Sequence, residues 1–189
     1  MAFISLTQEA ANLLGIDWQK SDPPPSHLPS LEDWLLDVVC SDGDNHGIIF
    51  YNKLTGFAVG IRPMEYNLNY CMDVFQELLL RLLNDNGLTT HVFHLFSLFR
   101  TQSVYRNNDK SENANMGQVK RSIIWWLDPA NKSRVNNSYD LLHRINDECR
   151  VGNNYRSSIL ERFLNEVRHI GKPPKNFSVP PDLLEREIH

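Results

Sequence analysis

Two short stretches, GIIFYN (residues 47–52) and GFAVGI (residues 56–61), decide the fold that this sequence predicts. Both are rich in β-branched and aromatic residues, and the link Asn-Lys-Leu-Thr between them is short enough for a hairpin. Arg62-Pro63 ends the second stretch, because proline cannot donate a hydrogen bond to a sheet ladder. We therefore predict two antiparallel strands here.

The longest regular pattern is LNYCMDVFQELLLRLLNDN (residues 68–86), in which apolar residues recur at i, i+3, i+4 and i+7. This spacing predicts a buried amphipathic helix that ends at Gly87. The apolar segment at residues 91–98 can instead be read as an alternating pattern, with His91 and Phe93 on one side of an extended chain. It is predicted to be a strand that pairs with the hairpin.

Before the hairpin the sequence predicts two short elements and a connector. Residues 4–14 form the first element, in which Thr7 caps a helix start. The run SDPPPSHLPS (residues 21–30) holds four prolines and is predicted to be an extended Pro-rich connector. Ser30 then caps a helix over residues 31–39, where two acidic residues in the first turn suit the helix dipole.

The second half of the chain is predicted to be mainly helical. Helices are expected at residues 118–128, 138–149 and 155–170, and the polar segment 106–118 before them is expected to be a surface loop. Residues 172–189 are predicted to be a Pro-rich extended tail.

Together these elements predict a single α+β domain over residues 1–189. Its small antiparallel sheet consists of the hairpin and the 91–98 strand, helices cover one face, and the C-terminal part is helical. The predicted core contains large apolar residues from most elements: Trp34, Ile49, Phe57, Val59, Phe75, Leu79, Leu82, Phe93 and Trp126.

Composition limits the class of function. The chain has 189 residues, of which 41% are hydrophobic and 22% charged, and its formal net charge is -4. A net negative charge argues against a protein whose whole surface binds nucleic acid, although it permits a local basic patch. The N-terminus lacks a signal-peptide pattern, and no apolar run approaches the roughly 20 residues that span a membrane. We expect a soluble, cytoplasmic protein without a membrane partner.

No motif for a cofactor or a metal stands out. Cys40, Cys71 and Cys149 are too widely spaced for a zinc ribbon or a disulfide framework, and we expect free thiols. His91 and His94 are three residues apart, but they point to opposite faces of the predicted strand and have no third ligand nearby. The sequence therefore predicts neither a metal site nor a cofactor.

Two patterns in the C-terminal helices leave a nucleic-acid function open. Arg162 and His169, with six residues between them, resemble the arginine–histidine pair of helical ribonucleases of the HEPN class, although Phe163 replaces the polar residue that usually follows the arginine. Such a pair would polarise the RNA 2′-hydroxyl and the scissile phosphate. A second pattern, Arg144, Arg150 and Arg156, could follow a phosphate backbone, but interleaved acidic residues favour an ordinary solvated helix surface.

A series of landmarks runs through the chain: Trp34 before a strand that ends at Asn52, then a polar segment, then a late stretch. The polar segment contains Ser111, Asn113, Asn115, Met116 and Gly117, and the late stretch contains Ile145, Asn146 and Gly152. In this order the chain resembles, over about residues 3–155, a family of small uncharacterised prokaryotic proteins known only as a domain of unknown function. That family's late proline is missing here. The resemblance implies a fold outline and no activity.

These observations favour a non-catalytic binding or adaptor protein that acts on another protein, in a mobile-element or defence context, because no set of nucleophile, base and oxyanion donor can be assembled. The HEPN-like ribonuclease is the alternative.

Two binding sites are predicted. In the first, Asn113 caps the helix after the polar segment, and Asn115 and Asn52 lie beside the helix N–H groups. Together they would form a polar concavity for a small anion or a partner's backbone. The second is Trp125, which points about 100° away from Trp126 on a helix and is predicted to be exposed at an interface if Trp126 is buried. The alternative is that both tryptophans are buried between two layers.

Overall fold

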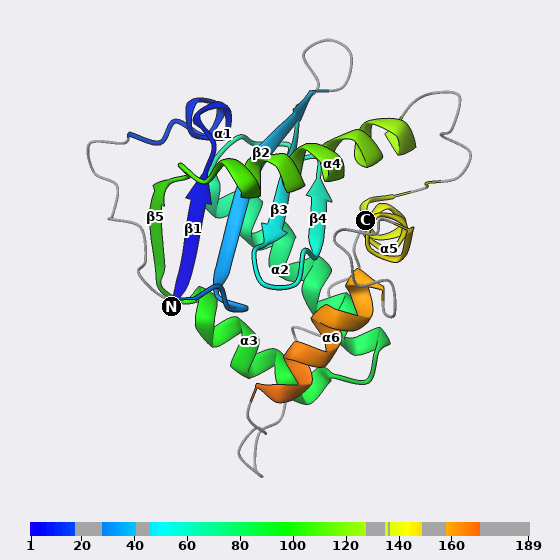
Figure 1. The fold of residues 1–189 in the computed structure, drawn as a ribbon. Coiled ribbons are helices and arrows are strands. Elements are labelled where there is room, and N and C mark those ends of the chain that lie inside the picture. Colours follow the sequence, from blue (N-terminus) through cyan, green and yellow to red (C-terminus); the bar gives the residue numbers. More distant parts are fainter. Residues whose placement is uncertain (18–27, 41–45, 128–134, 136, 149–157, 171–189) are drawn as a thin grey trace.

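The computed structural model describes residues 1–17, 28–40, 46–127, 135, 137–148 and 158–170. These residues form a five-stranded mixed sheet with helices on both faces, which confirms the α+β class (Figure 1). The order across the sheet is β4-β3-β2-β1-β5, and β1 runs parallel to both of its neighbours. The strands are β1 (Ala2–Leu6), β2 (Asp33–Cys40), β3 (His46–Asn52), β4 (Ala58–Ile61) and β5 (Gln102–Arg106).

The hairpin is confirmed as β3 and β4. The two strands are antiparallel, with Ile48 opposite Ile61 and Tyr51 opposite Ala58. Gly56 in the link has φ +78, a left-handed conformation that only glycine adopts at little cost. The turn between the strands therefore depends on this glycine.

The helix predicted at residues 31–39 is wrong, because this segment is the central strand β2. Its side chains are buried on both sides of the sheet: Trp34 and Leu36 face one core, and Leu35 and Val39 face the other. A strand buried on both faces reads as a continuous apolar run, which a helix pattern can imitate. The sheet is therefore larger than predicted, and it is mixed instead of purely antiparallel.

The first element is a strand followed by a helix. β1 ends at Leu6, and Thr7 then caps α1 (Gln8–Leu13), with its side chain accepting a hydrogen bond from the Ala10 N–H group. The predicted cap is confirmed, but the strand before it was not anticipated. It lies between β2 and β5, and so makes the parallel part of the sheet.

The strand predicted at residues 91–98 is also wrong. The 3-10 turn η2 (Thr89–His91) leads directly into the helix α3 (Val92–Phe99). Val92, Leu95 and Phe99 are buried on one side of α3, a helical spacing that outweighs the apparent alternation. Phe93, predicted to be core, lies on the half-buried side.

Helices cover both faces of the sheet. α2 (Leu68–Asp85), α3 and α6 (Ile159–His169) share one core with Trp34, Phe50 and Phe57. On the other face, α4 (Lys110–Leu127) crosses the upper half of the sheet in Figure 1, and α5 (Ser138–Glu148) lies at the β4 edge. Helices on one face alone were predicted, so the second layer corrects that expectation.

The structure contains three of the predicted helices and most of the predicted core residues. The helices expected at 68–86, 138–149 and 155–170 are present as α2, α5 and α6. Seven of the predicted core residues are buried: Trp34, Ile49, Phe57, Val59, Phe75, Leu79 and Leu82. The side chain of Trp126, most of the 21–30 connector and the 172–189 tail lie outside the described residues.

The polar segment 106–118 is mostly helix, which corrects the predicted loop. α4 begins at Lys110, eight residues before the expected start, and Met116 within it is fully buried against the sheet. Propensity alone argues against a helix in this segment, so the contact with the sheet outweighs it.

Candidate functional site

Two ion pairs join α4 to the sheet face that it crosses. Near the start of α4, Glu112 Oε2 lies 2.8 Å from Lys53 Nζ, just after β3. In the second half of α4, Lys120 Nζ lies 2.6 Å from Asp37 Oδ2 of β2. Both pairs are largely shielded from water, and the Lys53 side chain is only 9% exposed. Charges so placed are costly unless paired, so they fix the position of α4 on the sheet.

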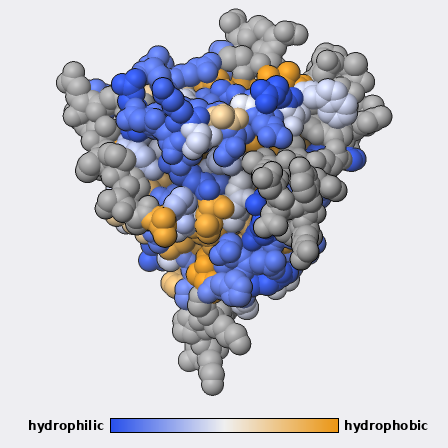
Figure 2. Space-filling view, in the orientation of Figure 1, coloured by the Kyte–Doolittle hydropathy of each residue, from blue (hydrophilic) through white to orange (hydrophobic). Residues whose placement is uncertain are grey.

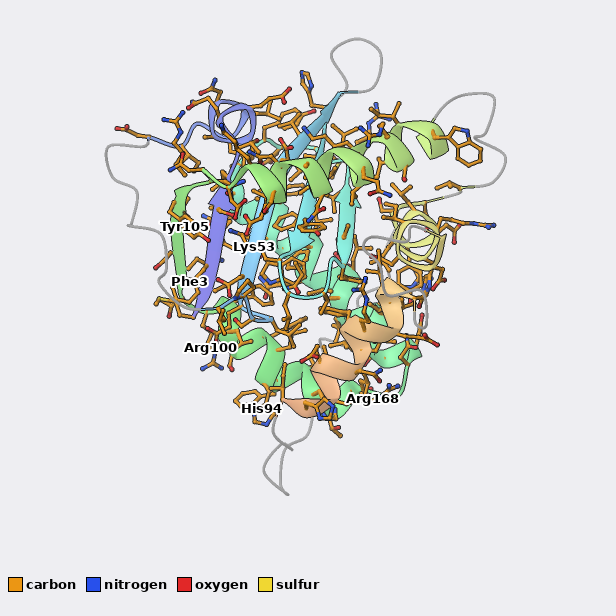
Figure 3. All side chains as sticks on the ribbon, in the orientation of Figure 1. Phe3, Lys53, His94, Arg100, Tyr105 and Arg168 are labelled. Atoms are coloured by element: carbon orange, nitrogen blue, oxygen red, sulfur yellow. The ribbon has the colours of Figure 1, made fainter. Side chains whose placement is uncertain are left out.

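Lys53 is the buried cation of this face. Its Nζ atom also donates a hydrogen bond of 3.2 Å to the Tyr105 hydroxyl and lies 5.3 Å from the centre of that ring. In Figure 3 the two residues lie on the same face of the sheet, below α4. Burial lowers the pKa of Lys53, but the hydrogen bonds to Glu112 and Tyr105 raise it to above its ordinary value. The amine therefore stays protonated at neutral pH and acts as a cation and donor.

Tyr51, two residues earlier on the same face, borders this cluster. Burial raises the pKa of its phenol, the charge of Glu112 raises it further, and the charge of Arg162 opposes both. A Cβ atom placed on Gly56 would lie 3.6 Å from the Tyr51 hydroxyl and 3.9 Å from Arg162 Nη2. The guanidinium of Arg162 thus reaches the same end of the sheet from α6. The cluster can donate hydrogen bonds, whereas Lys53 and Tyr51 are unsuited to accept a proton at neutral pH.

The second ion pair belongs to a polar group around Asp37. The other oxygen of this carboxylate accepts a hydrogen bond of 2.6 Å from the Thr7 hydroxyl, the cap of α1. Glu9 of α1 lies 3.9 Å from Lys120 Nζ. The group therefore ties α1, β2 and α4 together, a structural role.

The predicted anion concavity is arranged differently from the expectation. Asp109, and not Asn113, caps α4: its Oδ1 atom accepts hydrogen bonds from the N–H groups of Ser111 (2.8 Å) and Glu112 (3.3 Å) and from the Ser111 hydroxyl. The hydrogen bond from the Ser111 hydroxyl, followed by those from the backbone, lowers the pKa of Asp109. Asn113 lies one turn into the helix and accepts from Asn107. The helix start is therefore occupied by a carboxylate of the chain itself.

Asn52 does not face α4. Its amide group donates hydrogen bonds of 3.2–3.4 Å to the carbonyl groups of Ser30, Leu31 and Asp33, and its oxygen accepts from the Thr55 N–H and hydroxyl groups. The residue is fully buried. It fastens the hairpin turn to the segment before β2. Asn115, its expected companion, is exposed on α4.

Trp125 is exposed, as expected for the second site. Its exposed fraction is 48%, and the adjacent Ile124 is 45% exposed. Ile123 on the inner side of α4 is buried and packs close to Gly60 of β4, where a Cβ atom would lie 3.5 Å from its methyl group. A firmly packed helix thus presents two large apolar side chains to solvent.

The residues of the ribonuclease alternative are far apart on α6. His169 is seven positions after Arg162, so the two residues lie about 10 Å apart along the helix axis. Arg162 is partly buried next to the sheet, whereas His169 is exposed in the last turn. Of the arginines proposed to follow a phosphate backbone, Arg144 is exposed on α5, and Arg150 and Arg156 lie outside the described residues.

Cys71, His91 and His94 carry the thiol and imidazole groups that the sequence singled out. Cys71 is free and buried, and burial raises its thiol pKa to about 11. His91 ends η2 and His94 lies on α3, so the two histidines are not on a strand. In the described part of the chain, no three His, Cys, Asp or Glu side chains come close enough to hold a metal ion. None of the helices described there is long and apolar enough to cross a membrane.

Sequence reasoning missed the charged cluster on the sheet face. Lys53 and Glu112 are 59 residues apart, and each occurs in a segment where a charged residue is unremarkable. The two residues meet because α4 packs on the face of the sheet to which Lys53 points, and the sequence did not predict this second helical layer. The only local signal is the polar segment around residue 112, whose composition is typical of a surface loop.

Comparison with known proteins gives a family and no function. No curated protein and no solved structure matches the chain. A family model described as a domain of unknown function, DUF6933, matches residues 3–161. The match begins one residue into β1 and includes the other four strands and most of the helices described above. The chain therefore belongs to the DUF6933 family.

Proposed function

We propose that this chain is a non-catalytic binding protein that contacts another protein through the outer side of the second half of α4. The observation that carries the proposal is the adjacent pair Ile124 and Trp125, each nearly half exposed on a part of α4 whose inner side packs against the sheet. Tryptophan is strongly enriched among the residues that dominate binding energy at interfaces. In Figure 2, small areas of hydrophobic residues reach the surface along the upper edge, among the polar side chains that cover most of that region.

The chemistry of the charged cluster supports a binding role over catalysis. Lys53 and Tyr51 keep their protons at neutral pH because their pKa values are raised, so neither supplies a general base. The cap of α4 is filled by Asp109, which leaves this helix start unsuited to a substrate anion. The groups assembled here are better suited to hold the fold than to transform a ligand.

Capture of a partner by the tagged protein, read by mass spectrometry, tests the proposal. Trp125→Ser is expected to lose a protein that the wild-type chain captures, while its melting temperature stays unchanged. Met64→Ser is the matched control, because Met64 is 85% exposed on a different part of the surface. A partner retained by Trp125→Ser, or lost equally with Met64→Ser, would contradict the proposed surface.

The ribonuclease alternative is tested separately with purified protein and labelled RNA. We expect no cleavage. Cleavage that disappears in both Arg162→Ala and His169→Ala would replace the binding proposal. Capture that depends on RNA would indicate a nucleic-acid partner, and nuclease treatment of the lysate before capture distinguishes this case.

A further inference from the structure

We propose that the first half of α4, residues 110–117, is a lid that opens locally from the sheet and uncovers Lys53, while the second half of the helix stays docked. The inference concerns a different part of α4 from the proposed binding surface and does not depend on it. It is based on four observations: the composition of the segment, its packing, the ion pair beneath it and the position of Gly117.

The first half of α4 is a poor helix former by composition. Among its eight residues are Asn113, Asn115 and Gly117, all of which disfavour a helix interior. Glycine costs about 1 kcal/mol relative to alanine, and asparagine and serine compete for backbone hydrogen bonds outside the helix. This half is helical because something other than propensity holds it.

The apolar contact of the first half is small. Of residues 110–117, all of which the structure describes, Met116 is the one apolar side chain that is buried, and most of the others are exposed. The second half differs, since Val119 and Ile123 are both buried and Lys120 pairs with Asp37 at 2.6 Å. Packing therefore holds the second half more strongly than the first.

The ion pair between Glu112 and Lys53 is the main polar contact that closes the lid. Glu112 is the inward-facing carboxylate of the first turn, and its oxygen lies 2.8 Å from the amine. An opened lid exchanges this pair for two hydrated charges, so the desolvation cost of the pair is recovered on opening. Opening would leave the Lys53 amine and the Tyr105 hydroxyl, joined at 3.2 Å, accessible from solution.

Gly117 lies at the boundary between the two halves and serves as the hinge. A Cβ atom built on it would have nothing within 4 Å, so alanine fits there without a clash. Gly117→Ala therefore strengthens the helix without changing its packing. It isolates the helical propensity of the segment from every other contribution.

The test measures how often Lys53 becomes accessible. The full chain is treated briefly with acetic anhydride, and acetylation of Lys53 is compared with that of Lys120 by peptide mass spectrometry. Amide hydrogen exchange over residues 110–117 is measured in parallel. Gly117→Ala is expected to slow both Lys53 labelling and local exchange about fivefold. Glu112→Gln, which keeps the side-chain size, is expected to accelerate both roughly tenfold or more.

The amides of α2 report global unfolding and serve as the reference. If residues 110–117 exchange no faster than α2 does, or if Gly117→Ala protects α2 and the first half of α4 by the same factor, the lid does not open by itself and the proposal fails. Equal labelling changes at Lys53 and Lys120 would also overturn it, because the whole helix would then detach. Partner capture through Trp125 is measured independently, so the two proposals can fail separately.

Discussion

At the scale of single residues, two asparagines that were predicted to form one site have different roles. The Asn52 side chain is buried and makes five hydrogen bonds, two of them to the segment before β2 and one to Asp33 at the start of β2, whereas Asn115 is an exposed helix residue. The difference follows from the side of β3 to which Asn52 points. Asn52 ends β3 with its side chain toward Ser30 and Leu31, whereas Lys53, the first residue after the strand, pairs with Glu112 of α4.

We predict that Asn52→Ala lowers the free energy of unfolding by about 2–4 kcal/mol, because it leaves buried carbonyl and N–H groups without partners. Asn115→Ala is expected to change it by at most about 0.5 kcal/mol, toward stabilisation, because alanine favours a helix. Urea denaturation of the two variants measures the contrast. Equal effects would show that both residues act at one site, as the sequence suggested.

Prediction at this scale succeeded where the determinant is local. The cap Thr7, the burial of Trp34 and the exposure of Trp125 each follow from a few neighbouring residues, and each is confirmed. The pairing of Lys53 with Glu112 was out of reach, because it depends on the position of a helix 59 residues further along the chain.

At the scale of elements, the errors arise where a segment is buried more completely than its pattern suggests. β2 is apolar on both faces, so its alternation is hidden, and α3 is short enough for its helical spacing to resemble alternation. α2, with 18 residues and one clear apolar side, was predicted within one residue. An apolar pattern predicts its element correctly when the element is long and has a single buried side.

The edge of β4 is closed by a side chain instead of a strand. Asn146 of α5 accepts a hydrogen bond of 2.8 Å from the Ala58 N–H group and donates one of 2.6 Å to the Ala58 carbonyl, so it pairs with the strand much as a neighbouring backbone would. The Asn146 amide also donates to Leu142 within its own helix. α5 is thereby held in register with β4.

We predict that Asn146→Ala destabilises the fold by about 2–3 kcal/mol, because both backbone groups of Ala58 stay buried without partners. Asn146→Asp is expected to be no better, since its second oxygen would face the Ala58 carbonyl. Thermal unfolding checks both variants, with Asp147→Ala, an exposed neighbour, as the control. A melting temperature for Asn146→Ala equal to that of the control would contradict the edge-pairing role.

At the scale of the whole molecule, the sheet order explains why the topology could not be read from the sequence. The first strand inserts between β2 and β5, segments about 30 and 100 residues away, and its parallel pairing leaves no local mark. The hairpin that was recognised therefore sits at one edge of a sheet whose other half was missed. The two helical layers follow from that wider sheet, because each of its faces needs cover.

The stability of the whole molecule should decrease at alkaline pH, and Cys71 provides the test. Its side chain is fully buried, and burial raises the thiol pKa from about 9 to about 11. The folded state therefore keeps a proton that the unfolded state releases. The contribution is fully present below about pH 9 and is lost as the pH rises toward 11. Lys53 and Tyr51, whose pKa values are also raised, change stability in the same direction.

The comparison of wild type with Cys71→Ala isolates the thiol from those other groups. Between pH 8 and pH 11 the wild-type chain is expected to lose about 2–3 kcal/mol more than the variant, the value that a shift of roughly two pKa units implies. The cavity left by the substitution lowers the variant's stability at every pH by the same amount, so it cancels in the slope. Urea denaturation at several pH values measures both slopes. Parallel slopes would mean that the Cys71 thiol ionises as readily in the folded chain as in the unfolded one, and hence that water reaches it beneath α2.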